Sequence, residues 1–212
     1  MARSLRHHRP GFLYHLFSRG NNKEKIFFNN SDKEKFIGNL KRFKKQFKYK
    51  LYAYVLMSNH FHLLLQVKKE SISKIMQVIM TSYTMYINKK HDRTGHLFSG
   101  RFKSIIVDED EYLLQVIRYI HLNPVKSGLC QNPDQYIWSS FSDYLSFNTS
   151  LIDNKKILFL FGNSIKKQKE KFLDFTQRGI DKNWDIFQKQ KRGVLGKEKF
   201  VRYLSRSLGK RV

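Results

Sequence analysis

Residues 51–67 read LYAYVLMSNHFHLLLQV. This stretch contains two apolar runs, 51–57 and 61–67, on either side of a short polar turn, Ser58-Asn59. Apolar runs of this length favour strands, and a short turn signal between two of them favours a hairpin. We therefore expect two antiparallel strands here.

The segment before the hairpin predicts a strand and a helix. An apolar and aromatic run over 12–18 ends at the turn-forming cluster 19–22. Ser31 and Glu34 then have the spacing of a capping box, and apolar residues follow at helical spacing as far as Phe47. A strand and a capped helix thus precede the hairpin.

The segment after the hairpin predicts helix, strand and helix. Ser71 can cap a helix with one apolar face. Beyond the polar loop 92–100, residues 102–107 favour a fourth strand, and Asp108 opens a further helix. This helix is expected to end by Asn123, because proline disfavours helical geometry in the residue before it and residue 124 is proline.

The order of these elements predicts an α+β fold of the ferredoxin-like kind, an antiparallel sheet with two helices on one face plus an additional helix. One face of the sheet is then left for function. Residues 1–150 would form this domain, and residues 151–212 a basic, mainly helical C-terminal extension with helical patches at 157–161 and 200–208 around a turn at 193–196. The extension is either a DNA-binding element or a basic amphipathic helix docked on the domain.

The charge of the chain points to a polyanionic partner. Of 212 residues, 41 are Lys or Arg and 17 are Asp or Glu, which gives +24, shared about equally between the two parts. With 41% hydrophobic residues the chain is no disordered polycation, so nucleic acid is the expected partner, against the alternative of a merely soluble basic protein. With no apolar run long enough to span a bilayer and a single cysteine, Cys130, we expect a cytoplasmic protein with no membrane partner.

Two pairs of residues could carry chemistry. His60 and His62 flank Phe61 on a strand, so both imidazoles face one side and the phenyl ring faces the core. Tyr119 and Asn123, four residues apart, share one face of a helix. Two histidines and an amide oxygen suit Mg²⁺ or Mn²⁺ bound to a phosphate, although spacing alone favours an ordinary amphipathic-helix tyrosine over a nucleophile at Tyr119.

Four stretches resemble one family in the same order along residues 10 to 145. These are Ser-Arg-Gly-Asn at 18–21, MSNHFHLL at 57–64, GHLFSGRFKS at 95–104 and RYIHLNPV at 118–125. Together they resemble the small single-tyrosine HUH transposases of the IS200-like kind, specifically the REP-associated branch. The resemblance implies the HUH endonuclease fold, which is again ferredoxin-like.

The resemblance also implies roles for site residues. His60 and His62 would be ligands of a divalent metal, Mg²⁺ or Mn²⁺, with Asn123 as third ligand where the family often has glutamine, and Tyr119 would be the nucleophile. The implied enzyme is a transposase that nicks and rejoins single-stranded or hairpin DNA through a 5′-phosphotyrosine intermediate. Its DNA would be repeated palindromes near its own gene, and it could act as a homodimer. Residues in the family-like motifs expected to contact DNA are Arg19, Asn21, His96, Arg101 and Lys103.

Other interpretations stay open at this point. A domesticated protein could bind or regulate DNA hairpins without cleaving them, and an RNA-binding ferredoxin-like module would instead expose aromatic residues on its sheet. Phe98 and Phe102 could stack on unpaired bases or belong to the core. Tyr112 and Gln115 share the face of Tyr119 and could line the site. The histidines left without a role are His7, His8, His15, His91 and His121, the last regarded as structural.

Overall fold

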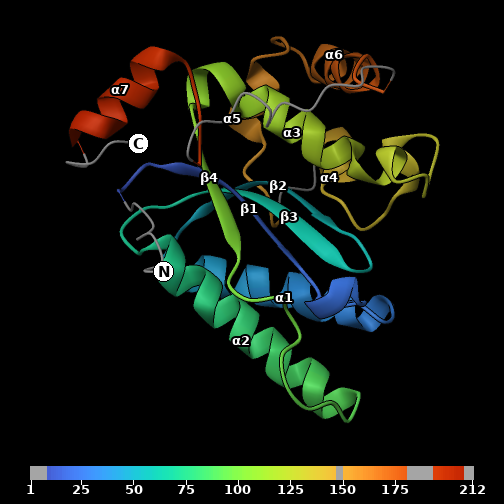
Figure 1. The fold of residues 1–212 in the computed structure, drawn as a ribbon. Helices are drawn as coiled ribbons and strands as arrows, with labels where there is room; N and C mark the ends of the chain where they lie inside the picture. The colour runs from blue at the N-terminus through green and yellow to red at the C-terminus, as the bar shows by residue number, and fades with distance from the viewer. Residues whose placement is uncertain (1–8, 147–149, 181–192, 208–212) are drawn as a thin grey trace.

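The computed structural model describes residues 9–146, 150–180 and 193–207 of the chain. Its centre is a five-stranded sheet in the order β2-β3-β1-β4-β5 (Figure 1). The first four strands pair antiparallel, and β5 adds to β4 in parallel. The order β2-β3-β1-β4, with a helix after β1 and another after β3, confirms the ferredoxin-like prediction, and the parallel β5 makes the sheet mixed.

The elements follow the predicted order. The strands are β1 (Leu13–Arg19), β2 (Lys50–Leu56), β3 (His60–Gln66), β4 (Lys103–Val107) and β5 (Val194–Leu195). The helices are α1 (Asn30–Phe47), α2 (Ile72–Lys90), α3 (Glu109–Lys126), α4 (Phe141–Leu145), α5 (Lys155–Phe159), α6 (Ile165–Gln177) and α7 (Glu198–Ser207), with 3₁₀ turns at Asn21–Lys23 and Pro133–Gln135.

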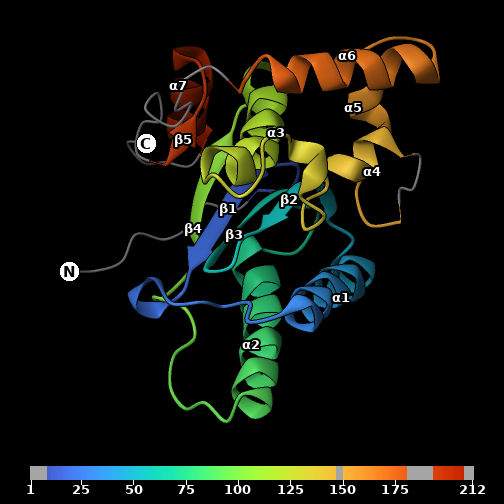
Figure 2. The same ribbon diagram turned by 90° about the vertical axis from the view of Figure 1, so that its right-hand side faces the viewer.

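Helices cover both faces of the sheet. α1 and α2 lie on one face, and α3 crosses the other, with α4, α5 and α6 beyond it (Figures 1 and 2). The face that we expected to be left for function is therefore partly covered by α3, so a site on that face lies between helix and sheet. Among the described residues, no helix combines the length and the apolar character that crossing a membrane requires.

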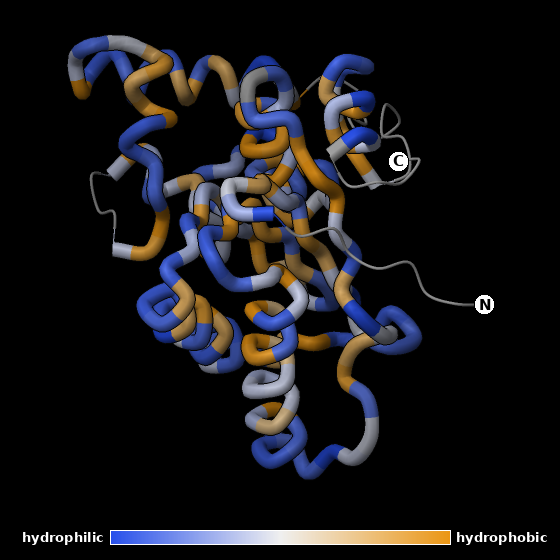
Figure 3. The backbone as a smooth tube through the Cα atoms, turned by 90° about the vertical axis from the view of Figure 1, so that its left-hand side faces the viewer, coloured by the Kyte–Doolittle hydropathy of each residue, from blue (hydrophilic) through white to orange (hydrophobic). Residues whose placement is uncertain are grey.

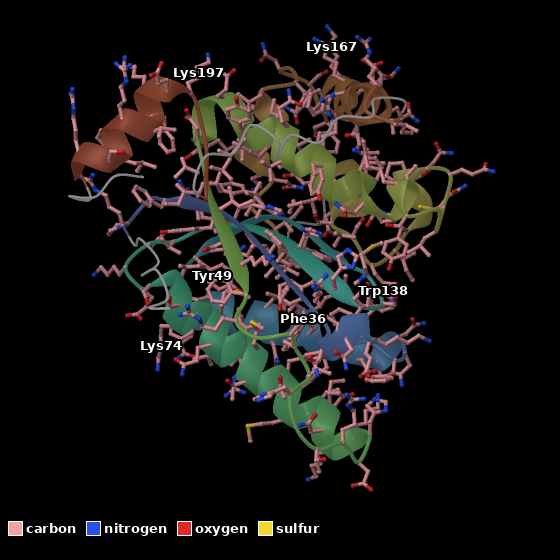
Figure 4. All side chains as sticks on the ribbon, in the orientation of Figure 1. Phe36, Tyr49, Lys74, Trp138, Lys167 and Lys197 are labelled. Atoms are coloured by element: carbon pink, nitrogen blue, oxygen red, sulfur yellow. The ribbon has the colours of Figure 1, made fainter. Side chains whose placement is uncertain are left out.

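Successive side chains of β3 point to opposite faces of the sheet. Phe61 is fully buried on the α1 side, where its ring lies 4.9 Å from that of Phe36. His62, one residue on, points to the α3 side, since successive side chains of a strand alternate. Hydrophobic positions gather on the strands and on the helix turns that face them (Figure 3), and Phe36 lies within this layer (Figure 4).

Helix α1 is capped earlier in the sequence than predicted. Its N-cap is Asn29, whose side chain accepts from the backbone N–H of Asp32, while the Asp32 carboxylate accepts from the N–H of Asn29. Ser31 instead donates its hydroxyl to the Asn29 side chain at 2.7 Å. Asp32 prevails as the capping partner because its buried carboxylate also pairs with Lys90 of α2 at 2.6 Å. The predicted cap of α2 by Ser71 is confirmed.

The prediction that α3 ends by Asn123 is wrong, because the helix continues through Pro124 to Lys126. A proline in the last turn removes a single intrahelical hydrogen bond, and the following turn still closes, with Ser127 N–H donating to the Asn123 carbonyl at 3.0 Å. Asn123 therefore keeps helical geometry, and its side chain stays on the face that carries Tyr119.

The C-terminal extension packs on the domain at several places, among them α6 and β5. Phe172 of α6 is fully buried and stacks on Tyr144 of α4, with ring centroids 4.4 Å apart. β5 occupies part of the segment 193–196 where a turn was expected, because the edge of β4 offers it hydrogen-bond partners, such as Ile106 N–H donating to the Gly193 carbonyl. The domain boundary after residue 150 stays a prediction.

Candidate active site

The histidine pair sits at the start of β3, as the strand pattern predicts. His62 is buried and His60 is half-buried, and their ring centroids lie 5.3 Å apart with the planes at 89°. His60 Nδ1 lies 2.7 Å from the Asn59 side-chain oxygen, an acceptor, so His60 donates in this bond. Its Nε2 is then the ring nitrogen with a lone pair to offer.

His15, which the sequence analysis left without a role, joins this pair. It lies on β1 two positions from Phe17, the residue opposite His62, so His15 and His62 are diagonal neighbours on one face. Their rings are nearly coplanar and meet edge to edge, with centroids 5.1 Å apart and His15 Nε2 2.9 Å from His62 Nδ1. Period-2 alternation in 12–18 could have indicated the face, but only the β1–β3 register brings the two rings together.

Tyr119 of α3 lies over the same rings. Its ring meets His62 edge to face at 5.7 Å between centroids and His15 in the same way at 5.9 Å. Lys126, two turns further along the helix, places its ammonium group 5.8 Å from the centroid of the tyrosine ring. The structure therefore brings Tyr119 to one of the two predicted histidines, His62, next to a positive charge.

Asn123 stays one turn from Tyr119 and bonds back to it. Its Nδ2 donates to the Tyr119 carbonyl at 2.8 Å, which fixes the amide and leaves Oδ1 as the acceptor that a cation could use. This hydrogen bond joins Asn123 to α3 rather than to either histidine of β3. A role as third ligand stays a prediction.

Tyr112 and Gln115 are not gathered in the same way. Gln115 accepts from Arg118 Nη2 at 2.6 Å, and Arg118 packs over Phe175 of α6 at 4.6 Å, so this pair belongs to the contact between α3 and α6. His121 is fully buried, bonds the Ser140 hydroxyl at 2.8 Å and packs against Tyr144, which agrees with a structural role.

The electrostatics of the histidines suit metal binding. Burial lowers the pKa of His60, and burial together with the neighbouring His15 and His60 places the pKa of His62 well below 6.5. Both rings are therefore neutral at pH 7, the form that binds a metal. Among the described residues no three His, Cys, Asp or Glu side chains form a metal cluster, so a cation here would take further oxygen ligands from Asn123, water or a phosphate.

A basic pocket opens beside His60. It has a volume of about 420 Å³, and its lining includes Asn59, His60 and three of the residues predicted to contact DNA, Arg19, Arg101 and Lys103. Lys103 also lies 5.9 Å from the ring of Phe17, which stacks on His62. Lys23, which was not predicted, also lines this pocket, and four cations around it make it suitable for the phosphates of a nucleic acid.

The other two predicted DNA residues line a second pocket. Asn21 and His96 border a hollow of about 460 Å³, which shares Arg101 with the first pocket. Phe98 also lines this hollow, yet Phe98 and Phe102 are buried and 7% and 5% exposed, so both belong to the core rather than to an exposed stacking platform. The structure thus gathers all five predicted residues along one side of His60.

The loop after β1 needs glycine to form this side. Gly20 N–H donates to the Asn59 carbonyl at 2.8 Å, and Gly20 also bridges to Phe98. A Cβ at Gly20 would lie 2.0 Å from the Glu24 carbonyl oxygen, so any larger residue would push the turn away. Gly20 therefore joins the end of β1, the start of β3 and the loop 92–102 around the basic pocket.

A ferredoxin-like sheet whose strand β3 carries a His-x-His pair beneath Tyr119 of α3, the helix after β4, agrees with the HUH endonuclease fold that the sequence resemblance implies. The chain belongs to the transposase IS200-like family, whose sequence model matches residues 9–123. A search of curated proteins finds no match.

Several solved structures resemble the chain, and two of them are transposases. One is a REP-associated tyrosine transposase bound to a REP hairpin, with a TM-score of 0.60, 16% identity, and coverage of 71% of this chain and 88% of that one. The other is described as a transposase of Deinococcus radiodurans R1, at 16% identity over 56% of this chain and 95% of that one. Its TM-score of 0.40 is too low to support a conclusion. The first match supports the α+β fold.

Proposed function

We propose that this protein nicks and rejoins single-stranded or hairpin DNA through a covalent bond to Tyr119, with a divalent cation at His60 and His62. The observation that carries the proposal is the contact of Tyr119 with His62, at 5.7 Å between ring centroids, beside a pocket lined by four cations. Membership of the transposase IS200-like family supports the same chemistry.

The step is a transesterification. The Tyr119 phenol oxygen attacks the scissile phosphorus, a new P–O bond to tyrosine forms, and the bond to the 3′ oxygen breaks. The phenolic proton is lost, and the leaving 3′ oxygen takes up a proton to become a free hydroxyl. Because the phosphotyrosine keeps the phosphodiester energy, a 3′ hydroxyl can reverse the step and join strands without a nucleotide cofactor.

The residues around Tyr119 prepare this step. A phenol has an ordinary pKa near 10 and is a weak nucleophile at pH 7. A bound Mg²⁺ or Mn²⁺ would polarise the phosphate oxygen and offset its developing charge. His60 and His62 would hold the cation through Nε2, Asn123 would add an amide oxygen, and the ammonium group of Lys126 favours the negative charge on the phenol oxygen.

The basic pocket would hold the DNA on either side of the reacting phosphate. Arg19, Arg101 and Lys103 can each pair with a backbone phosphate, while Asn21 and His96 in the adjoining hollow can bond an unpaired base. The relative of known structure was solved with a REP hairpin. We extend this preference to the present chain, with imperfect palindromes near its gene as the substrate.

The test uses a 3′-labelled single-stranded oligonucleotide from the DNA flanking the gene, incubated with the protein and Mn²⁺. The wild-type protein should become covalently labelled, because Tyr119 keeps the 5′ phosphate of the labelled fragment. Tyr119→Phe should lose the adduct and retain DNA binding, since the ring that packs on His15 and His62 is unchanged. Tyr112→Phe, two turns earlier on α3, is the matched control and should form the adduct.

An adduct that persists in Tyr119→Phe would refute the nucleophile. If the wild-type protein binds the hairpin tightly and never forms an adduct with Mn²⁺ or Mg²⁺, the domesticated hairpin-binding protein is the better interpretation. Removal of the metal with EDTA should stop cleavage and leave most of the binding, because phosphate contacts from Arg and Lys do not need the cation.

A further inference from the structure

We infer that His15 is a positioning residue that sets the orientation and tautomer of His62 and so prepares its Nε2 for the metal. This inference rests on the proposed function, since it concerns the cation that His60 and His62 would bind. It starts from one contact, the 2.9 Å separation of His15 Nε2 and His62 Nδ1 in the interior of the protein.

The direction of this hydrogen bond decides which atom of His62 can act. A neutral imidazole carries one N–H, so one of the two facing nitrogens must donate and the other accept. If His62 donates from Nδ1, its Nε2 has a lone pair free for a cation. If His15 donates instead, the proton of His62 lies on Nε2, and the ring cannot bind a metal there. His15 therefore controls the function of His62 through the position of one proton.

The alignment of the two rings and the packing of Phe17 against them hold this contact in place. The His15 and His62 planes are 4° apart, and Phe17 stacks on both, at 5.3 Å from His15 and 5.6 Å from His62. His15 is 1% exposed, so water does not compete for the bond. His62 is thus fixed by β1 in the way that Asn59 fixes His60, and each histidine uses Nδ1 for a protein partner.

His15 is better placed to hold a ligand than to be one. Its Nε2 is directed at His62, and among the residues that the structure describes no three His, Cys, Asp or Glu side chains gather as a metal cluster. Residues that orient a metal-binding histidine through its other nitrogen typically change metal affinity 10- to 100-fold when they are replaced. We expect the same range here.

The experiment measures Mn²⁺ affinity by calorimetry without DNA, so that the readout does not depend on cleavage. His15→Leu removes the bond and should weaken Mn²⁺ binding by roughly 10- to 100-fold. His15→Gln places an amide oxygen near the position of Nε2 and should restore most of the affinity. Leu64→Val is the matched control, because Leu64 lies opposite His15 in the β1–β3 register and its truncation alters packing without touching the bond.

A measurement on the wild-type protein covers the case in which His15→Leu does not fold. Nitrogen-15 NMR of the histidine rings in the metal-free protein should show the His62 proton on Nδ1, and a proton on Nε2 would overturn the inference. A folded His15→Leu protein that binds Mn²⁺ as tightly as the wild type would also overturn it. If the wild-type protein binds no Mn²⁺, the metal-dependent function fails instead, while the tautomer still shows whether His15 orients His62.

Discussion

The proposed role of Asn123 as a metal ligand depends on one side-chain hydrogen bond. Its amide nitrogen is bound to the Tyr119 carbonyl, so its oxygen is the atom offered to a cation. Asparagine is shorter than the glutamine that often stands at this position in the family. If Asn123 is the third ligand, as we propose, removing its oxygen should weaken the proposed metal site.

We therefore expect Asn123→Leu to raise the Mn²⁺ concentration that gives half-maximal cleavage by about tenfold, which corresponds to about 1.4 kcal/mol of binding free energy. The measurement is the rate of adduct formation across a Mn²⁺ titration. Ser127→Ala, at an exposed position just beyond α3, is the control and should leave the titration unchanged. An unchanged titration in Asn123→Leu would remove Asn123 from the ligand set.

Asp143 offers a residue-level prediction far from the chemistry. Burial in α4 raises the pKa of its carboxyl from 3.8 to about 6. The unfolded chain releases this proton near pH 4 and the folded chain holds it to about pH 6, so the free energy of unfolding falls as the pH rises between these values. Above pH 6 the half-buried Asp143 carboxyl is ionised, and its charge lowers the free energy of unfolding.

Asp143→Asn should therefore be more stable than the wild type at pH 7 and equal to it near pH 4. A shift of two pKa units would correspond to about 2.7 kcal/mol for a fully buried group, and partial exposure reduces the expected gain to about 1 kcal/mol. Urea unfolding at the two pH values measures it. The backbone carbonyl that accepts from Asn154 at 2.7 Å is kept in the variant. A variant that is less stable at pH 7 would contradict the prediction.

Among the elements, α6 decides whether the C-terminal extension is part of the core. Phe172 is fully buried in an aromatic group with Tyr144, Phe141 and Phe161, and Arg118 of α3 packs over Phe175 of the same helix. α3 carries Tyr119 on its other side. The extension thus supports the helix that carries the proposed nucleophile, from the side that faces away from the sheet.

Phe172→Ala should lower the free energy of unfolding by about 3 to 5 kcal/mol, the usual range for removing a buried phenylalanine. Thermal unfolding followed by circular dichroism checks this, with Lys171→Ala, an exposed neighbour on the same helix, as the control. One cooperative transition shifted to lower temperature would mean that the extension folds with the domain. A second, separate transition would show that residues 151–212 unfold on their own.

At the scale of the whole molecule, charge is spread over surfaces with different functions. Lys167 on α6 and Lys197 beside α7 lie on the α3 side of the sheet, and Lys74 lies on α2, across the sheet from them (Figure 4). The pocket beside His60 is lined by Arg19, Arg101 and Lys103, among other residues. A total of +24 therefore attracts nucleic acid to the molecule as a whole, while the pocket cations would hold it at the site.

Salt dependence of DNA binding separates these two contributions. Removing one cation that pairs with a phosphate of a single strand reduces the slope of log affinity against log salt by about 0.7. Arg101→Ala should reduce the slope by about this amount, and Lys167→Ala should leave it unchanged, as measured by fluorescence anisotropy between low and high salt. An equal reduction in Lys167→Ala would show that the extension binds DNA as well.

Local sequence patterns were enough to predict the order of the elements and the ferredoxin-like topology. They also predicted that His60 and His62 point to the face of the sheet opposite Phe61. These follow from local patterns, because alternation and helical spacing fix which side of an element a residue occupies. Local patterns misplaced the cap of α1 and the end of α3. The cap involves a partner distant in sequence, because Lys90 of α2 pairs with Asp32, whereas the helix end is closed by local hydrogen bonds of residues 127–129 that the proline rule does not consider.

The contacts between side chains of different elements could be seen only in the tertiary structure. The β1–β3 register joins His15 to His62 across 47 positions of sequence, and the packing of α3 on the sheet places Tyr119 over both rings. The same packing covers the face that the topology leaves open. No local pattern encodes such contacts, because strand register and helix packing are settled by burial over the whole core.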